Sequence, residues 1–154
     1  MMSPPCYPMS GHGSISLSAT EVNTNPTKYR LVLATRDGEH FAIAPQSLYE
    51  MYVVCSRPAS ANGFGMSPQR AHAEIARVRT LFPLLPETTR VYPRWEGLIA
   101  KYVVLGKQAH DTRLVAIMIE HRVPRLLTFN DADFEKYAEI VALNPFDVLG
   151  VARM

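Results

Sequence analysis

Residues 106–134 read GKQAHDTRLVAIMIEHRVPRLLTFNDADF, and this stretch decides the fold class. Its first apolar residues recur at the spacing of one helical face: Leu114, Val115, Met118 and Ile119. Asp111 lies three residues before Leu114 and four before Val115, which is the spacing of neighbours on one face of a helix. We therefore expect its carboxylate on the apolar side of the helix. The helix should end before Pro124, because the residue that precedes a proline is pushed out of the α region.

A short buried strand is expected next, over residues 125–129. It delivers Asn130, Asp131 and Asp133 just beyond its carboxyl end. In open α/β sheets, ligands bind at the edge where the strands end. Oxygen ligands from a helix and from a loop are thereby brought towards one place, as a hard divalent cation requires.

The segment AHDTRLVA, followed by LLTFNDADF, resembles the second half of a PIN domain. Within that family it looks most like the small bacterial VapC-type toxin ribonucleases. The resemblance extends back through AIAPQSLYEMYVV and covers residues 41–145. It implies an α/β, PIN-like three-layer fold: a single domain with a short parallel sheet flanked by helices. It also implies a metal-dependent endoribonuclease that cleaves single-stranded RNA with Mg²⁺ or Mn²⁺, has an antitoxin protein as partner and forms a homodimer.

Length and composition are consistent with one globular domain of 154 residues. No apolar run approaches the ~20 residues needed to cross a bilayer, and no secretory signal is recognised. Cys6 and Cys55 make neither a disulfide framework nor a zinc site, and Cys55 is expected to be a small buried hydrophobe. These features favour a cytoplasmic setting. The net charge of +2 is too small to indicate nucleic-acid binding by itself.

The first 25 residues form a poorly ordered or degenerate segment in this interpretation, and residues 26–150 form the PIN-like domain. The resemblance implies a first strand that ends in an Asp-Thr-Asn motif and supplies the first metal-binding aspartate. Aligning residues 18–22 with this motif puts Ala19 at the aspartate position and Glu21 at the asparagine position. In a second alignment these residues follow a first strand that is absent. Either way that aspartate is missing, and Glu21 either fills a ligand position or is a solvated loop carboxylate.

The remaining elements follow from caps and apolar periods. We expect helices over residues 25–37, 45–58, 68–81, 91–102 and 134–137, strands over 40–44 and 140–143, and a short tail after Asn144 and Pro145. The strand over 40–44 is expected to be a parallel member of the sheet.

Glu50 is the only charged residue between Gln46 and Ser56, in a helix that is apolar on nearly all sides. Such a helix is expected to be buried, and a buried carboxylate must be paired, protonated or bound to a metal. The PIN resemblance implies a metal role for Glu50 and for Asp111. The alternatives are a surface or hydrogen-bonding role for Glu50, and for Asp111 a helix-start position favoured by the dipole.

The family pattern in the acidic loop falls on Thr128, Asn130, Asp133 and Phe134. Asn130 occupies a position often held by a ligating aspartate, and its neutral amide is a weaker ligand. The resemblance thus implies catalytic residues Glu50, Asp111 and Asp133, metal ligands Glu50, Asp111, Asp133 and Asn130, and substrate-binding residues Lys107, Arg57 and Thr128. Any of the loop residues can instead be a helix N-cap.

Basic residues can flank the acidic cleft and hold a phosphate backbone, or form an ordinary solvated surface: Arg57, Arg70, Arg77, Arg79, Arg90, Arg94, Lys101 and Lys107. Three functions remain open at this point. The first is the metal-dependent ribonuclease, with impaired activity. The second is a catalytically inactive PIN-fold protein that binds RNA or an antitoxin partner. The third is a small-molecule phosphohydrolase on a similar scaffold.

Overall fold

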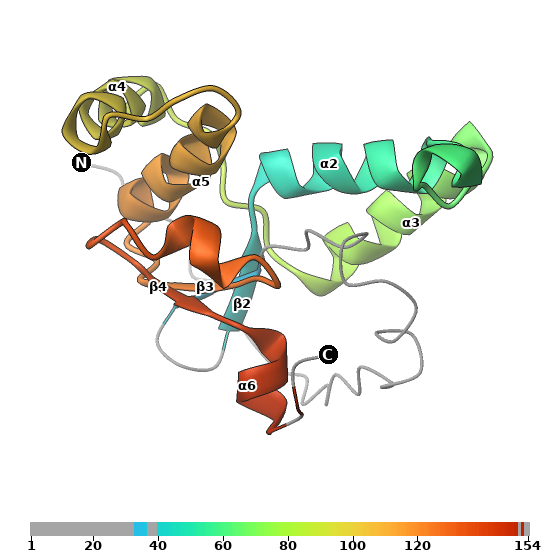
Figure 1. Cartoon of the computed structure of the whole chain (residues 1–154). Helices are drawn as coiled ribbons and strands as arrows, with labels where there is room; N and C mark the ends of the chain where they lie inside the picture. The colour runs from blue at the N-terminus through green and yellow to red at the C-terminus, as the bar shows by residue number, and fades with distance from the viewer. Residues whose placement is uncertain (1–32, 37–39, 151, 153–154) are drawn as a thin grey trace, which may run out of the picture.

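The computed structural model describes residues 33–36, 40–150 and 152 (Figure 1). This part of the chain has a mixed α/β architecture. Its elements are β1 (Leu33–Arg36), β2 (His40–Ile43), α2 (Pro45–Ser56), η2 (Ala59–Ala61), α3 (Pro68–Leu81), α4 (Val91–Tyr102), α5 (Gln108–Glu120), β3 (Arg125–Leu127), η3 (Asp131–Phe134), β4 (Val141–Leu143) and α6 (Pro145–Leu149). Helices α2 and α3 extend to one side of the molecule, and α4 and α5 lie on the other (Figure 1).

The four strands form one sheet in the order β2-β1-β3-β4. Strands β3 and β4 are parallel, with Leu126 opposite Ala142. Strand β1 is antiparallel to both of its neighbours, β2 and β3. It follows that β2, β3 and β4 all run in one direction, so their carboxyl ends meet at the same edge of the sheet. The expected parallel sheet is therefore present in these three strands, with an antiparallel strand inserted among them.

The prediction of a helix over residues 25–37 is wrong where the structure describes this stretch, because Leu33–Arg36 is strand β1. Residues 25–32 lie outside the described residues. The physical reason is strand pairing on both sides: β1 pairs with the adjacent strand β2 on one side and with the distant strand β3 on the other. Such pairing satisfies backbone groups on both edges, and tertiary contacts of this kind override a weak local helix preference.

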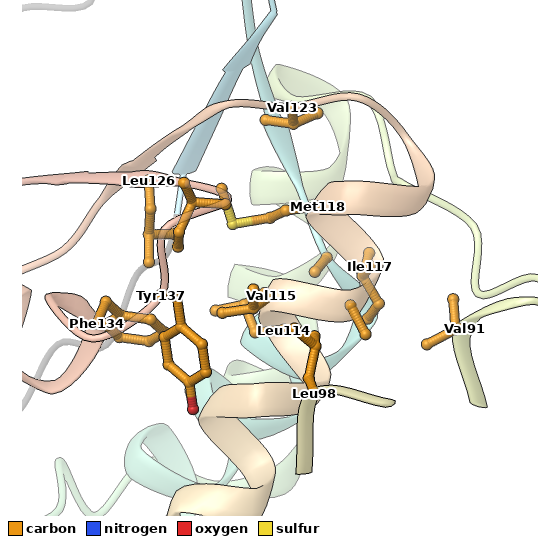
Figure 2. Close-up of a cluster of buried hydrophobic side chains, with 13 residues drawn as sticks. Val91, Leu98, Leu114, Val115, Ile117, Met118, Val123, Leu126, Phe134 and Tyr137 are labelled. Atoms are coloured by element: carbon orange, nitrogen blue, oxygen red, sulfur yellow. The ribbon is translucent and has the colours of Figure 1, made fainter. Parts of the chain in front are cut away.

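Helix α5 forms the centre of the main hydrophobic core. Four consecutive residues, Val115, Ala116, Ile117 and Met118, are completely inaccessible to solvent. Figure 2 shows Met118 and Val115 directed towards Leu126 of β3 and Tyr137, and Val91 on the opposite side of the helix; Leu98 of α4 belongs to the same cluster. A helix with neighbours on so many sides must be apolar around most of its circumference. The predicted helix–strand unit is thus confirmed, with β3 ending at Leu127 rather than at Phe129.

Helices α2 and α3 pack around a second, smaller cluster that contains Ile43, Leu48, Val78 and Phe82. The prediction that α2 is buried on nearly all sides is wrong, because Tyr49 is 60% exposed and Val53 is 52% exposed. One face of α2 therefore lies at the surface.

Cys55 is buried as predicted, and burial raises the pKa of its thiol, as does the nearby Glu74 charge.

Two further elements differ from the sequence-based expectations. The short helix expected over residues 134–137 is instead the 3₁₀ helix η3, which ends at Phe134. The expected tail after β4 contains helix α6, whose N-cap Asn144 accepts a hydrogen bond from the Phe146 amide. Asn144 is thus the capping residue that starts a new helix rather than the end of the ordered chain.

Helix α4 is tied to the carboxyl end of α5 by a charged cluster. The side chain of Glu120 is 2% exposed and accepts hydrogen bonds from Arg94, Arg90 and Thr88. The hydrogen bond from Arg94 is the main cause that holds the pKa of Glu120 below its ordinary value, and the Arg90 charge adds to it. Arg113 forms a bidentate pair with Glu87 nearby. These contacts fix the orientation of α5.

The hydroxyl of Tyr137 fixes the other end of α5. Thr112 Oγ1 donates to the carbonyl of Gln108 at 2.9 Å, so the Tyr137 hydroxyl, 2.7 Å away, donates to Thr112. We expect Tyr137→Phe to cost about 1 kcal/mol of unfolding free energy. This corresponds to a fall in Tm of about 2–4 °C in thermal unfolding. The matched control is Tyr92→Phe, whose hydroxyl is exposed and bonds only the exposed Glu96 within the described residues. An equal fall for both variants would contradict this role of Tyr137.

Candidate acidic site

Three polar segments follow the carboxyl ends of the three strands that share a direction. Helix α2 begins two residues after β2, the acidic loop follows β3, and Asn144 follows β4. All three segments therefore lie at one edge of the sheet. This is the edge at which open α/β sheets bind their ligands. The expected position of the acidic loop, just beyond the strand 125–127, is confirmed.

Glu50 is connected to the beginning of α5 through Gln46. The Nε2 atom of Gln46 donates to Glu50 Oε1 at 3.1 Å and to the carbonyl oxygen of His110 at 2.9 Å. His110 immediately precedes Asp111 in the chain. The turn of α2 that carries Glu50 is thus held against the turn of α5 that carries Asp111. Glu50 itself is only half-buried, unlike the buried carboxylate that the sequence predicts.

Asp111 is 7% exposed and lies in the first turn of α5, on the buried side of the helix as predicted. Its turn is anchored from several elements. The Trp95 indole donates to the carbonyl of Ala109 at 2.9 Å, and Lys136 donates to the Gln108 side chain at 2.7 Å. The position of this turn is therefore set by α4, by the segment after η3 and, through Gln46, by α2.

The acidic loop is shaped by its own hydrogen bonds. The backbone amide of Asn130 donates to Thr128 Oγ1 at 3.2 Å, and Asn130 is the N-cap residue of η3. Asn144 Nδ2 donates to Asp131 Oδ1 at 2.9 Å, which joins the loop to the segment after β4. Asp133 is exposed. The structure therefore places Asn130 and Asp133 on the expected loop.

The three predicted substrate-binding residues lie in different surroundings. Lys107 is exposed, one residue before α5. Thr128 is 1% exposed, and its hydroxyl oxygen accepts the Asn130 amide. Arg57 follows the far end of α2 and donates to the carbonyl of Asn62 at 2.9 Å, within its own loop. That loop is tight, because a side chain on Gly63 would lie 2.0 Å from the Arg57 carbonyl oxygen.

Several of the basic residues named as possible phosphate contacts are used in ion pairs. Arg77 pairs with Glu74, and Lys101 pairs with Glu139. Arg90 and Arg94 both pair with Glu120. Of these pairs, those of Arg90 and Arg94 with Glu120 join α4 to α5. Lys107 is the exposed cation nearest in sequence to Asp111.

Within residues 33–36, 40–150 and 152, no three His, Cys, Asp or Glu side chains form a group that could hold a metal ion. The structure brings together the turns that carry Glu50 and Asp111, and it does not join Asp133 to them as a third member. Glu21 lies outside the described residues. The metal roles of Glu50, Asp111, Asp133 and Asn130 stay predictions.

Two residues of this edge were not selected from the sequence: Gln46 and Asn144. Each uses a side-chain amide to connect two different segments: Gln46 joins α2 to α5, and Asn144 joins the segment after β4 to the acidic loop. The only sequence signal for Gln46 is its helical spacing to Glu50, four residues later. For Asn144, the signal is the Asn-Pro pair, which is typical of a helix start.

No protein-family model matches the chain, and a search of curated proteins finds no match. Among solved structures, the fold is similar to that of a chain in the crystal structure of VapBC2 from Rickettsia felis bound to a DNA fragment from their promoter. The TM-score is 0.52 and the identity is 13%, over 67% of this chain and 73% of that chain. The similarity concerns the fold, and it is consistent with the PIN-like architecture. No helix among the described residues is both long and apolar enough to traverse a bilayer.

Proposed function

We propose that this chain is a VapC-type, metal-dependent endoribonuclease of reduced activity that cleaves single-stranded RNA. The observation that carries the proposal is the Gln46 bridge, which holds the Glu50 turn of α2 against the Asp111 turn of α5. Two carboxylate-bearing turns at the edge of the sheet where open α/β folds bind their ligands support this proposal, as does the similarity of the fold to that of a VapBC2 chain.

The donor set suits an ion of the Mg²⁺ type. Mg²⁺ keeps several waters and is usually bound through one or two carboxylates together with substrate phosphates, rather than by a closed protein cage. Glu50 and Asp111 supply such hard oxygen donors, so a group of three protein ligands is not required. When bound, Mg²⁺ or Mn²⁺ would supply an activated water and neutralise charge on the phosphodiester.

The remaining residues of the edge act on the RNA in this proposal. Lys107 is exposed near Asp111 and attracts the phosphate backbone. Asn130 offers its side-chain amide to the substrate or to the ion, and Asp133 offers a carboxylate to the ion from the exposed side of the loop. Thr128 contributes by holding the loop, because its hydroxyl oxygen accepts the backbone amide of Asn130; it makes no direct contact with the RNA in this proposal.

The test is RNA cleavage as a function of the metal. A single-stranded RNA oligonucleotide incubated with the chain should be cut in Mg²⁺ or Mn²⁺, and cutting should stop in excess chelator and return when metal is restored. Cleavage that persists in chelator would contradict the proposal. Hydrolysis of a small phosphomonoester, with RNA left intact, would favour the phosphohydrolase instead.

A specific observation favours a second function, that of an inactive PIN-fold protein that binds RNA or an antitoxin. Strand β1 lies between β2 and β3 and runs antiparallel to both, so its carboxyl end, Arg36, lies at the opposite edge of the sheet. The strand at this position carries Leu, Ala, Thr and Arg, and thus supplies no carboxylate. Binding of RNA without cleavage in any divalent metal would support this function.

The proposal includes an antitoxin partner and a homodimer built on α3, α4 and the segment that follows. Large apolar side chains are exposed there: Leu81 at 54%, Tyr92 at 62%, Val103 at 76% and Leu105 at 74%. We expect sedimentation velocity to give a dimer at micromolar concentration, because apolar and aromatic area of this kind favours self-association. The Val103→Ser, Leu105→Ser double variant should shift the equilibrium towards the monomer. A monomer for the unmodified chain would contradict the homodimer.

A further inference from the structure

Gln46 has an unusual environment for a glutamine in the first turn of a helix. It is 6% exposed, and the two hydrogens of its side-chain amide point to two acceptors on different elements. One acceptor is Oε1 of Glu50 in the next turn of α2, and the other is the main-chain carbonyl of His110 in α5. A side-chain NH₂ group has two hydrogens, so its donor capacity is fully used.

These acceptors fix the orientation of the amide. With the amide reversed, its oxygen would face a carboxylate and a carbonyl, neither of which has a hydrogen to donate. The oxygen of Gln46 therefore lies on the other side, where it is buried and has no hydrogen-bond partner within the described part of the chain. A buried acceptor without a partner destabilises the folded state, because it loses its hydrogen bonds to water and gains none in return. Native proteins contain few such groups, and those that persist call for an explanation.

Stability alone does not explain a glutamine at this position. An apolar side chain of similar shape, such as Met, would fill the same space without a buried, unpartnered oxygen. Replacing a buried polar group by an apolar one of the same shape is often neutral or stabilising. What Met cannot do is hold Glu50 against α5. The amide is thus suited to orienting the carboxylate.

We infer that Gln46 is a positioning residue of the acidic site: it holds the Glu50 carboxylate at the Asp111 end of α5, where both carboxylates are offered to a divalent cation. This inference rests on the proposed function. Groups that orient metal ligands through hydrogen bonds typically change metal affinity 10–100-fold when they are removed. Gln46 acts in this way through Glu50 and needs no contact with the ion.

The experiment measures Mn²⁺ affinity and stability in the same variants of the full chain. Free Mn²⁺ is followed by electron paramagnetic resonance during titration, and Tm is taken from thermal unfolding. Gln46→Met should weaken Mn²⁺ binding about 10-fold or more, with Tm equal to that of the unmodified chain or higher. The matched control, Gln69→Met, changes an exposed glutamine of α3 and should leave Mn²⁺ affinity unchanged. Glu50→Gln should abolish the binding that Gln46→Met weakens.

A second variant covers the case in which Gln46→Met does not fold. Gln46→Asn keeps the amide but is one methylene shorter, so it cannot reach both acceptors and should show the same loss. Mn²⁺ binding that survives in a folded Gln46 variant at unmodified strength would overturn the positioning role and leave the proposed function intact. Absence of Mn²⁺ binding by the unmodified chain would overturn the proposed metal site, and the positioning role with it.

Discussion

Asp111→Asn is expected to lower metal-dependent cleavage of single-stranded RNA by about 1,000-fold, equivalent to ~4 kcal/mol of transition-state stabilisation. Asn has nearly the same shape as Asp, so the buried first turn of α5 should keep its structure. The amide lacks the negative charge that holds a divalent cation. The measurement is the initial rate of cleavage of an RNA oligonucleotide in Mn²⁺, with Tm recorded for each variant.

Two matched variants separate this effect from a general loss of negative charge. Glu135→Gln removes an exposed carboxylate next to η3 and should leave the rate unchanged. Asp133→Asn should be milder than Asp111→Asn, about 10-fold, because Asn130 and Asp131 remain on the same loop. An Asp111→Asn variant that folds and cuts RNA at the unmodified rate would remove Asp111 from the site.

The part of the fold that local patterns determine was predictable from the sequence. Helix α3 is capped by Ser67, whose side chain accepts the Arg70 amide, and both of its ends match the prediction. Helix α4 and the helix–strand unit of α5 and β3 follow from apolar periods in the same way. Each of these elements is encoded by residues close together in the chain, which is the information that a single sequence carries most directly.

The direction of β1 could not be predicted in this way. Leu33–Arg36 is a strand because it pairs with the adjacent strand β2 and with β3, which lies about ninety residues later in the chain. Likewise, the exposed face of α2 was unpredictable, because Tyr49 and Val53 are apolar residues that the described part of the chain leaves uncovered. A sequence shows which side chains are apolar, but not whether another element lies over them.

The acidic site was predictable in its residue types and less so in its arrangement. The helical period placed Asp111 on the buried side of α5, and the strand pattern placed Asn130 and Asp133 beyond β3. The connection between Glu50 and α5 depends on the Gln46 side chain, which crosses from one helix to another. A contact between residues 46 and 110 produces no periodic pattern in the sequence, so it cannot be predicted from a single sequence.

Restoring a first strand that ends in Asp-Thr-Asn is expected to raise RNA cleavage by about 100-fold or more. In the present chain the position between β2 and β3 is filled by β1, which runs in the opposite direction and carries no acidic side chain. A grafted strand that runs parallel to β3 would instead end at the edge of the sheet that carries Thr128 and Asn144, which directly follow β3 and β4. Its aspartate would then add a charged oxygen ligand to those of Glu50 and Asp111.

The comparison needs the graft, the unmodified chain and a graft that carries Asn in place of the new aspartate, all assayed with one RNA in Mn²⁺. We expect the Asn graft to cut no faster than the unmodified chain, because it restores the strand without the charge. Vigorous cleavage by the unmodified chain would contradict the inactive-protein function and show that another group takes the place of the missing aspartate. If neither the graft nor the unmodified chain cuts RNA, the enzyme proposal fails. A graft that cuts, and that Asp111→Asn silences, would place the new aspartate and Asp111 in one site.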